Sequence, residues 1–215
     1  PVRIEVESTA ETAPIILQRA IQVDPKRRTQ LLKKLVEESD WDQVLVFVAT
    51  KYATEHVSDK LWKQGIKAAA LHGELSQGGR TKVLAALKNS EIQVLVATDV
   101  AARGLDIPEL PVVLNYDLPR SASDYTHRIG RTGRAGESGV AISFVSGHSA
   151  NGEAHFRLIE KRQAQRVPRE QIAGFEPTDL ESAPSATGGV KGLRKSKKDK
   201  LREAAAAAAA ASALA

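Results

Sequence analysis

The sequence alternates short apolar runs with segments of helical pattern, and this alternation limits the possible folds more than any other feature. Apolar or alternating runs typical of strands occupy residues 15–23, 43–49, 66–71, 92–97, 112–115 and 140–145. Helical patterns lie between them at about 25–36, 51–65, 79–88 and 123–129. Strands that alternate with helices predict a three-layer α/β fold, in which helices cover both faces of a mostly parallel sheet.

Two of the predicted helices begin at recognisable capping residues. Asp24 precedes Pro25, so Asp24 is the expected N-cap and Pro25 the expected first helical residue. Thr50 follows an apolar run and is expected to cap the next helix, which should end at Gly65.

Polar residues follow several of the predicted strands. Thr50, His72, Gly73 and Thr98 each lie just beyond the end of an apolar run. Ligands of open α/β sheets bind beyond the carboxyl ends of the strands. The sequence therefore predicts one functional edge that contains these residues.

The charge distribution argues against a generally basic domain. The formal net charge is +5, but Lys191 to Arg202 hold seven of the 31 basic residues and one of the 26 acidic ones. The rest of the chain is close to neutral, so any nucleic-acid contact there must come from individually placed residues.

Cysteine is absent, which excludes disulfides, thiolate metal ligands and a cysteine nucleophile. No apolar run approaches the ~18 residues of a membrane span, and we expect no membrane association. We predict no metal site in this chain and a cytoplasmic location, with which the composition is compatible.

The sequence changes character near residue 179. A segment rich in proline, serine and glycine leads into the basic run Lys191–Arg202 and then into eight consecutive alanines from Ala204. We predict one domain over residues 1–179 and a peripheral low-complexity tail over 180–215, flexible or partly artificial. The basic run has two open interpretations, a nucleic-acid-binding arm and a solubilising segment. Because methionine is absent and the chain opens on Pro1, we expect it to be cut from a longer product.

Two longer strings carry the most chemical information. One is the string His127-Arg128-Ile129-Gly130-Arg131-Thr132-Gly133-Arg134-Ala135-Gly136. Its guanidinium groups are forked and permanently charged, which suits bidentate contact with phosphate oxygens. The other is Ala97-Thr98-Asp99-Val100-Ala101-Ala102-Arg103-Gly104-Leu105-Asp106-Ile107, directly after an apolar run.

Both strings resemble those of the second motor domain of DEAD-box RNA helicases. Three further segments are similar to motifs of that family: residues 44–51, 71–74 and 76–80. The late segment 172–177 is similar to the RhlE-like bacterial branch. The resemblance covers residues 2 to about 179 and implies a RecA-like fold.

The resemblance implies roles in nucleotide chemistry. Arg131 and Arg134 match arginine fingers, which stabilise charge on a transferring phosphoryl group. Asp106 matches a ribose-binding aspartate, and Gly104 a position of close backbone approach to the nucleotide. His127 and Arg128 match residues that contact a partner domain and couple ATP binding to domain closure.

A second set of positions matches residues that hold RNA in relatives. Hydroxyls, main-chain amides and arginines grip phosphates without reading bases, so sequence-independent binding of the RNA backbone is implied. We interpret Trp41 and Trp62 as packing residues and expect no base-stacking platform. The matching positions are Thr50, Gly73, Gln77, Arg80, Thr98 and Arg103. Gly79 weakens the predicted start of the helix that carries Arg80.

Half of the expected active site is missing from the sequence. The chain contains no Gly-x-x-x-x-Gly-Lys-[Ser/Thr] phosphate loop and no Asp-Glu-Ala-Asp. The resemblance implies that ATP with Mg²⁺ is held by an N-terminal RecA-like domain of the same polypeptide, and that this chain alone is inactive. Two alternatives stay open: a related helicase that acts on DNA, and a non-catalytic RNA-binding or partner-recruiting module.

Overall fold

The computed structural model describes residues 16–39, 41–103, 110–133, 138–146 and 152–178. Within these ranges, seven parallel strands form one sheet in the order β3-β4-β2-β5-β6-β1-β7. The strands are β1 (Ile16–Gln22), β2 (Val44–Phe47), β3 (Ala68–Leu71), β4 (Val94–Ala97), β5 (Val112–Asn115), β6 (Gly139–Val145) and β7 (Arg169–Glu170). The predicted parallel α/β fold is confirmed.

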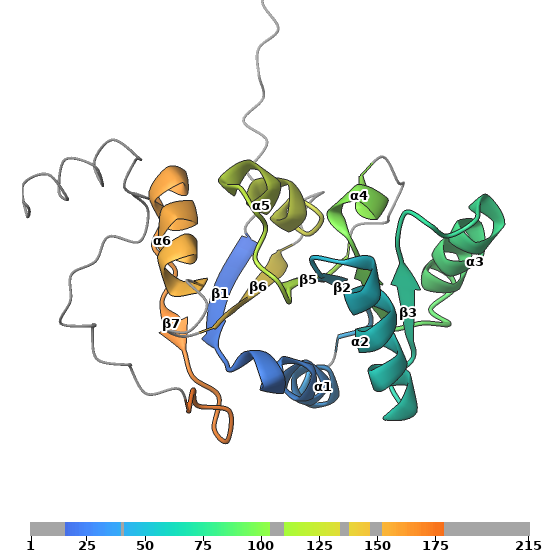
Figure 1. The fold of residues 1–215 in the computed structure, drawn as a ribbon, viewed down its shortest axis with the longest axis horizontal. Coiled ribbons are helices and arrows are strands. Elements are labelled where there is room, and N and C mark those ends of the chain that lie inside the picture. The colour runs from blue at the N-terminus through green and yellow to red at the C-terminus, as the bar shows by residue number, and fades with distance from the viewer. Residues whose placement is uncertain (1–15, 40, 104–109, 134–137, 147–151, 179–215) are drawn as a thin grey trace, which may run out of the picture. The chain divides into compact units, whose positions relative to one another are not determined.

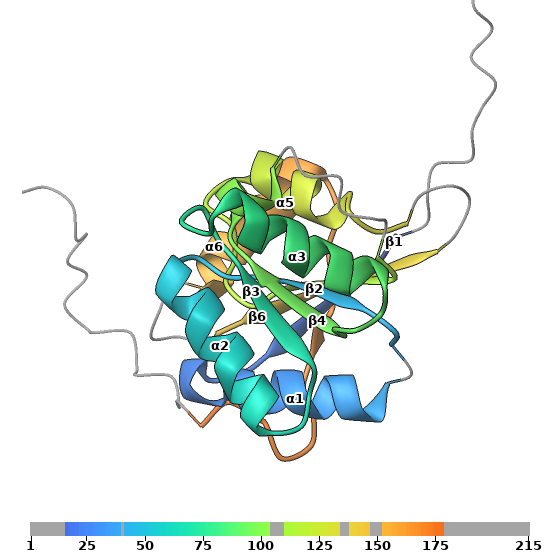
Figure 2. The same ribbon diagram turned by 90° about the vertical axis from the view of Figure 1, so that its right-hand side faces the viewer.

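Helices cover both faces of the sheet, as Figures 1 and 2 show. One face packs against α1 (Arg28–Glu38) and α2 (Lys51–Lys63). The other packs against α3 (Gln77–Lys88), α4 (Asp99–Ala102), α5 (Ala122–Ile129) and α6 (Gly152–Gln163). Because side chains alternate along a strand, successive residues of β2 enter the two different cores.

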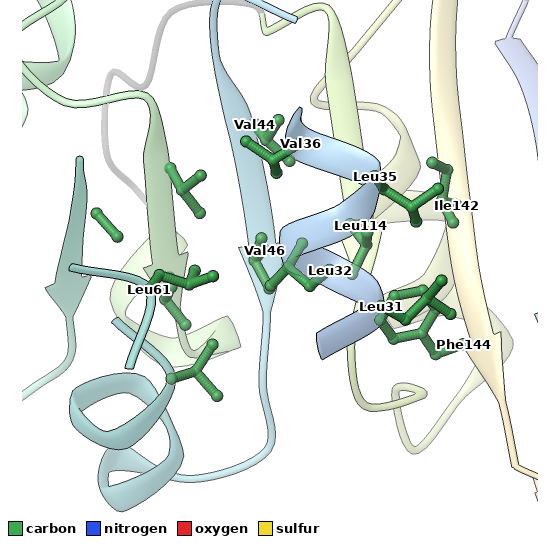
Figure 3. Close-up of a cluster of buried hydrophobic side chains, with 14 of the residues drawn as sticks. Leu31, Leu32, Leu35, Val36, Val44, Val46, Leu61, Leu114, Ile142 and Phe144 are labelled. Carbon is green, nitrogen blue, oxygen red and sulfur yellow. The ribbon is translucent and has the colours of Figure 1, made fainter. Parts of the chain in front are cut away.

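The core beneath α1 shows how the apolar pattern fixes a helix to the sheet. Leu31, Leu32, Leu35 and Val36 all point from α1 toward the strands (Figure 3). They meet side chains of three strands: Val44, Val46, Leu114, Ile142 and Phe144. Each fully buried leucine stabilises the fold by about 1.5–3 kcal/mol, so this face alone holds α1 firmly in place.

The strand β1 pairs in the sheet with strands that come much later in the sequence. It pairs along its whole length with β6, Ile16 opposite Gly139 and Gln22 opposite Val145. Its other edge pairs with β7 through Ala20 and Ile21. The first described strand is thus enclosed by the two last ones.

The start of α1 differs from the prediction. A 3₁₀ turn, Pro25–Arg27, precedes the helix, and the Asp24 side chain does not cap it. Asp24 Oδ2 instead accepts hydrogen bonds from the backbone N–H and the hydroxyl of Thr178, at 3.0 and 2.7 Å. Asp24 thus holds the predicted N-cap position before Pro25, but its side chain makes no capping hydrogen bond because a segment 154 residues later binds this carboxylate.

The final described segment packs against the domain. Ile172 and Phe175 lie against the core beneath α1, and the Arg27 guanidinium lies 4.8 Å from the Phe175 ring centroid. The domain thus includes residues up to Thr178, whereas the tail expected over 180–215 lies outside the described residues. In the described ranges, no helix has the length and apolar character needed to cross a membrane.

Candidate functional site

The candidate site lies where β3, β4, β2 and β5 end at the same edge of the sheet. These four strands are neighbours in the sheet, and all run in one direction. The segments that follow them carry Gly73, Thr98, Thr50 and Asp117 respectively. The sheet order therefore brings together the residues that the sequence placed on one edge.

Arg128 of α5 ties the ends of two strands to this helix. Its Nε and Nη2 donate to the two carboxylate oxygens of Asp99 at 2.6 and 2.7 Å. Its Nη1 donates to Asn115 Oδ1 at 3.0 Å and to the Asp117 carbonyl oxygen at 2.7 Å. The guanidinium also lies 4.8 Å from the Phe47 ring centroid. All these contacts fix α5 relative to β4 and β5.

This environment changes the expected role of Arg128. The residue is only 3% exposed, and its guanidinium nitrogens are engaged inside the domain. Direct contact of Arg128 with a partner domain, which the resemblance implied, does not fit this burial. A buried guanidinium needs several fixed acceptors, and the domain itself supplies them.

His127 and Arg131 flank Arg128 but behave differently. His127 is exposed and Arg131 is half-buried, and neither side chain bonds to another described residue. Together with Arg103 and Arg128 they line a small pocket between α4 and α5. The structure thus gathers four of the predicted site residues around one opening, with two side chains free to meet a ligand there.

The turn after α5 is held by Thr132 and Gly133. The buried Thr132 hydroxyl donates to the Pro111 carbonyl oxygen at 2.9 Å. Gly133 adopts a φ of +70°, and an added Cβ would lie 2.8 Å from Ile16 Cγ1. Glycine is required there for both conformation and space. The backbone that carries Arg131 is therefore fixed from both sides.

Arg103 links α4 to α5 at the surface of the site. Its guanidinium forms an ion pair with Asp124, although the Arg103 side chain stays 61% exposed. The Ser121 hydroxyl donates to the Asp124 carboxylate at 2.8 Å and, with Arg103, lowers the pKa of that carboxyl. Arg103 is available to a second anion because so much of its side chain faces solvent.

Thr50 and Thr98 start helices at the same edge. The Thr50 hydroxyl accepts a hydrogen bond from Ala53 N–H at 3.1 Å, which confirms the predicted cap. The Thr98 hydroxyl does not cap α4. Asp117 accepts from Ala49 N–H at 2.9 Å and thereby fixes the loop that leads to Thr50. Both hydroxyl protons remain able to donate to an anion.

The loop after β3 and the first turn of α3 carry the three remaining described residues of the predicted set. Gly73 and Gln77 are exposed, and Arg80 is half-buried with its Nε unpaired among the described residues. Helix α3 starts at Gln77, two residues earlier than predicted, because the Ser76 hydroxyl accepts from Gly79 N–H at 3.1 Å. This cap offsets the weak helical propensity of Gly79.

Gly104, Asp106 and Arg134 lie outside the described residues. The described ranges contain no group of three or more His, Cys, Asp or Glu side chains arranged to hold a metal ion.

Sequence reasoning missed the residues that position the site. Asp99, Asn115 and Asp117 hold Arg128, and Asp124 holds Arg103. Asp99 and Asp124 lie in or near the two long strings, but nothing in the sequence indicates which arginine each carboxylate meets. Asn115 is a polar residue at the end of an otherwise apolar run, which was the available signal.

Known proteins share both the sequence and this fold. A family model described as "Helicase conserved C-terminal domain" matches residues 27–136, about half of the chain. The ATP-dependent RNA helicase SrmB of Haemophilus influenzae is 36% identical over 207 residues, which are 94% of this chain and 45% of that protein. The chain spans less than half the length of such curated relatives.

Solved structures agree. One holds E. coli DEAD-box protein SrmB bound to regulator of ribonuclease activity A; it has a TM-score of 0.69 and 35% identity, covering 80% of this chain and 98% of that one. Another, S. cerevisiae Dbp5 bound to RNA and ADP BeF3, has a TM-score of 0.64 and 32% identity, covering 76% and 42%. The chain therefore belongs to the helicase conserved C-terminal domain family and is a domain of the DEAD-box RNA helicase type.

Proposed function

We propose that this chain is the C-terminal motor domain of an ATP-dependent RNA helicase of the RhlE-like branch. It works with an N-terminal RecA-like domain of the same polypeptide, in the cytoplasm. Its two tasks are to supply cationic side chains to the triphosphate and to hold part of the RNA backbone. The RhlE-like assignment rests on residues 172–177.

The observation that carries the proposal is the contrast between Arg128 and Arg131. Asp99, Asn115 and the Asp117 carbonyl group bind Arg128, whereas Arg131, three residues later in the turn after α5, has no partner among the described residues. A half-buried arginine on a fixed backbone is preorganised to meet an anion that arrives from outside the domain.

The nucleotide side of the proposal assigns Arg131 and Arg134 as arginine fingers. Arg131 places its fork where charge develops on the transferring phosphoryl group, and Arg134 is the second finger. Asp106 accepts a hydrogen bond from the ribose, and Gly104 allows close approach of the backbone. His127, which is exposed beside Arg131, contacts the partner domain, while Arg128 is a positioning residue for both.

The RNA side uses the other residues of the edge. Thr50 and Thr98 donate their hydroxyl protons to phosphates, Gly73 offers its backbone N–H, and Arg103 adds charge. Gln77 and Arg80 extend this surface onto α3. Groups of these kinds hold phosphates and sugars, so this part of the binding is independent of base sequence.

The remaining chemistry belongs to the absent N-terminal domain. Hydrolysis needs a phosphate cradle, a magnesium ligand and an in-line water in addition to positive charge at the γ-phosphate. The sequence contains neither a phosphate loop nor an Asp-Glu-Ala-Asp motif. ATP with Mg²⁺ is therefore held by the other domain, and this chain by itself turns over no ATP.

The test is RNA-stimulated ATP turnover by the longer polypeptide that carries this chain. Arg131→Lys should lower turnover by about 10³-fold, because an ammonium ion cannot reproduce the guanidinium fork. The matched control is Arg120→Lys, an exposed arginine just before α5, which should leave turnover unchanged. Turnover by Arg131→Lys within about twofold of the unmodified protein would exclude the finger assignment.

A further inference from the structure

Two exposed aromatic rings are stacked on the first turns of α2. The rings of Tyr52 and His56 have centroids 5.5 Å apart and an interplanar angle of 15°. They are four residues apart, which places them one above the other on a helix surface. Tyr52 is 72% exposed, so one face of this stack is open to solvent.

The stack lies beside the proposed RNA-binding edge. Tyr52 follows Thr50 by two residues, and two residues span at most about 7 Å of backbone. Helix α2 begins where β2 ends, and Figure 2 shows its outer side facing away from the sheet. A strand whose phosphate contacts Thr50 can therefore bring the adjoining base to the Tyr52 ring.

The charges around the stack do not oppose a polyanion. Glu55 lies 4.0 Å from Lys51 Nζ, and Asp59 pairs with Lys63 at 2.7 Å. The carboxylates on these turns of α2 thus each face a nitrogen group of the same domain.

An open aromatic face has a specific use in this setting. Tyrosine rings usually gain stability by burial, whereas Tyr52 and His56 lie on the side of α2 opposite the buried Thr54, Val57 and Leu61. Bases stack on exposed aromatic side chains with little preference for sequence, because every base has a π-face.

We propose that Tyr52 and His56 form a stacking platform for a nucleobase of single-stranded RNA, next to the phosphate held at Thr50. This inference rests on the proposed RNA-binding function and revises the expectation that no stacking platform is present. The platform adds affinity and holds the strand at the end of the site without selecting its sequence.

The experiment measures binding of the full 215-residue chain to two strands at low salt. One is an oligouridylate of ten nucleotides, and the other is an abasic strand with the same number of phosphates. Tyr52→Ala should weaken binding of the oligouridylate about tenfold or more and leave the abasic strand unaffected. Tyr52→Phe keeps the ring and should retain affinity.

Two controls separate this inference from the proposed function. Trp62→Ala removes another exposed aromatic of α2, about 15 Å along the helix, and should change neither affinity. Thr50→Val should weaken both strands, because it removes a phosphate contact. Equal losses on both strands in Tyr52→Ala, or none on either, would overturn the platform alone. Failure of the unmodified chain to bind either strand would overturn both the platform and the proposed function.

Discussion

Two arginines, the buried Arg128 and the half-buried Arg169, make similar contacts but lie in different regions of the domain. Each guanidinium lies over an aromatic ring, Arg128 at 4.8 Å from the Phe47 centroid and Arg169 at 4.7 Å from the Phe156 centroid. Each also forms a two-pronged contact with a carboxylate. Arg128 is at the functional edge, whereas Arg169 lies on β7 at the margin of the sheet.

The two arginines differ in the residues that surround them. Arg169 binds Glu153 and Glu160, both on α6, and so fixes the last helix to the last strand. Arg128 joins α5 to two strand ends and has unpartnered neighbours, His127 and Arg131, among the described residues. The same chemistry thus stabilises the fold in one region and positions reactive groups in the other.

The largest expected loss of stability comes from Arg169→Met. The Glu160 side chain is 2% exposed, so the substitution leaves a buried carboxylate with the Val167 N–H as its hydrogen-bond donor and the exposed Arg166 guanidinium 3.9 Å away. We expect the free energy of unfolding to fall by about 3–5 kcal/mol, measured by denaturant titration. The control is Arg157→Met, which removes a side chain that is 64% exposed and should cost less than about 1 kcal/mol. RNA affinity of the folded protein should not change; a selective loss of RNA binding would contradict the division of roles.

Arg128→Met should lower the unfolding free energy less than Arg169→Met does, but it should also weaken RNA binding. Asp99 is 31% exposed on its side chain and can regain water, which leaves mainly the buried Asn115 oxygen unsatisfied. We expect a loss of about 2–3 kcal/mol in unfolding free energy. RNA binding should weaken as well, because Asp117 and α5 lose their common anchor. Unchanged RNA affinity at a temperature where the variant is folded would show that Arg128 does not position the site.

The smallest effect concerns the pH dependence of stability. Hydrogen bonds from Arg169 lower the pKa of Glu160 below its value in the unfolded chain, about 4.3. The resulting stabilisation is fully present above pH ~4.3 and is lost as pH falls through the folded-state pKa. Glu160→Gln cannot titrate, so its unfolding free energy should decline less steeply between about pH 5 and 3. The control Glu37→Gln removes a carboxylate from an exposed i,i+4 ion pair and should leave the pH dependence of the unfolding free energy unchanged. If Glu160→Gln shows the same pH dependence as the unmodified protein, Glu160 does not contribute to it.

The fold was predictable because its signals are local. The apolar runs at 112–115 and 140–145 became β5 and β6 almost unchanged, and Thr50 caps α2 as its position predicts. Helix α6 and strand β7 were not predicted. Strand β7 has only two residues, both charged, so no periodicity could reveal it.

The candidate site was predictable in position but not in its internal pairing. Strand order alone brings Thr50, Gly73 and Thr98 to one edge. The burial of Arg128 depends on Asp99, 29 residues earlier, and such a pairing leaves no local pattern. The exposed Tyr52–His56 stack was not predicted, because an i,i+4 spacing does not indicate whether two rings face the core or the solvent.

The enclosure of β1 between β6 and β7 has a consequence for synthesis on the ribosome. Among the described strands Ile16–Gln22 is made first, yet its partner Gly139–Val145 appears about 120 residues later. At about 5–20 residues per second, β1 waits roughly 6–25 seconds for a neighbour. During that interval β2 to β5 can pair among themselves, while β1 has neither of its two partner strands. Within this domain, β1 is therefore the strand exposed longest to chaperones and to misassociation, until β6 and β7 emerge.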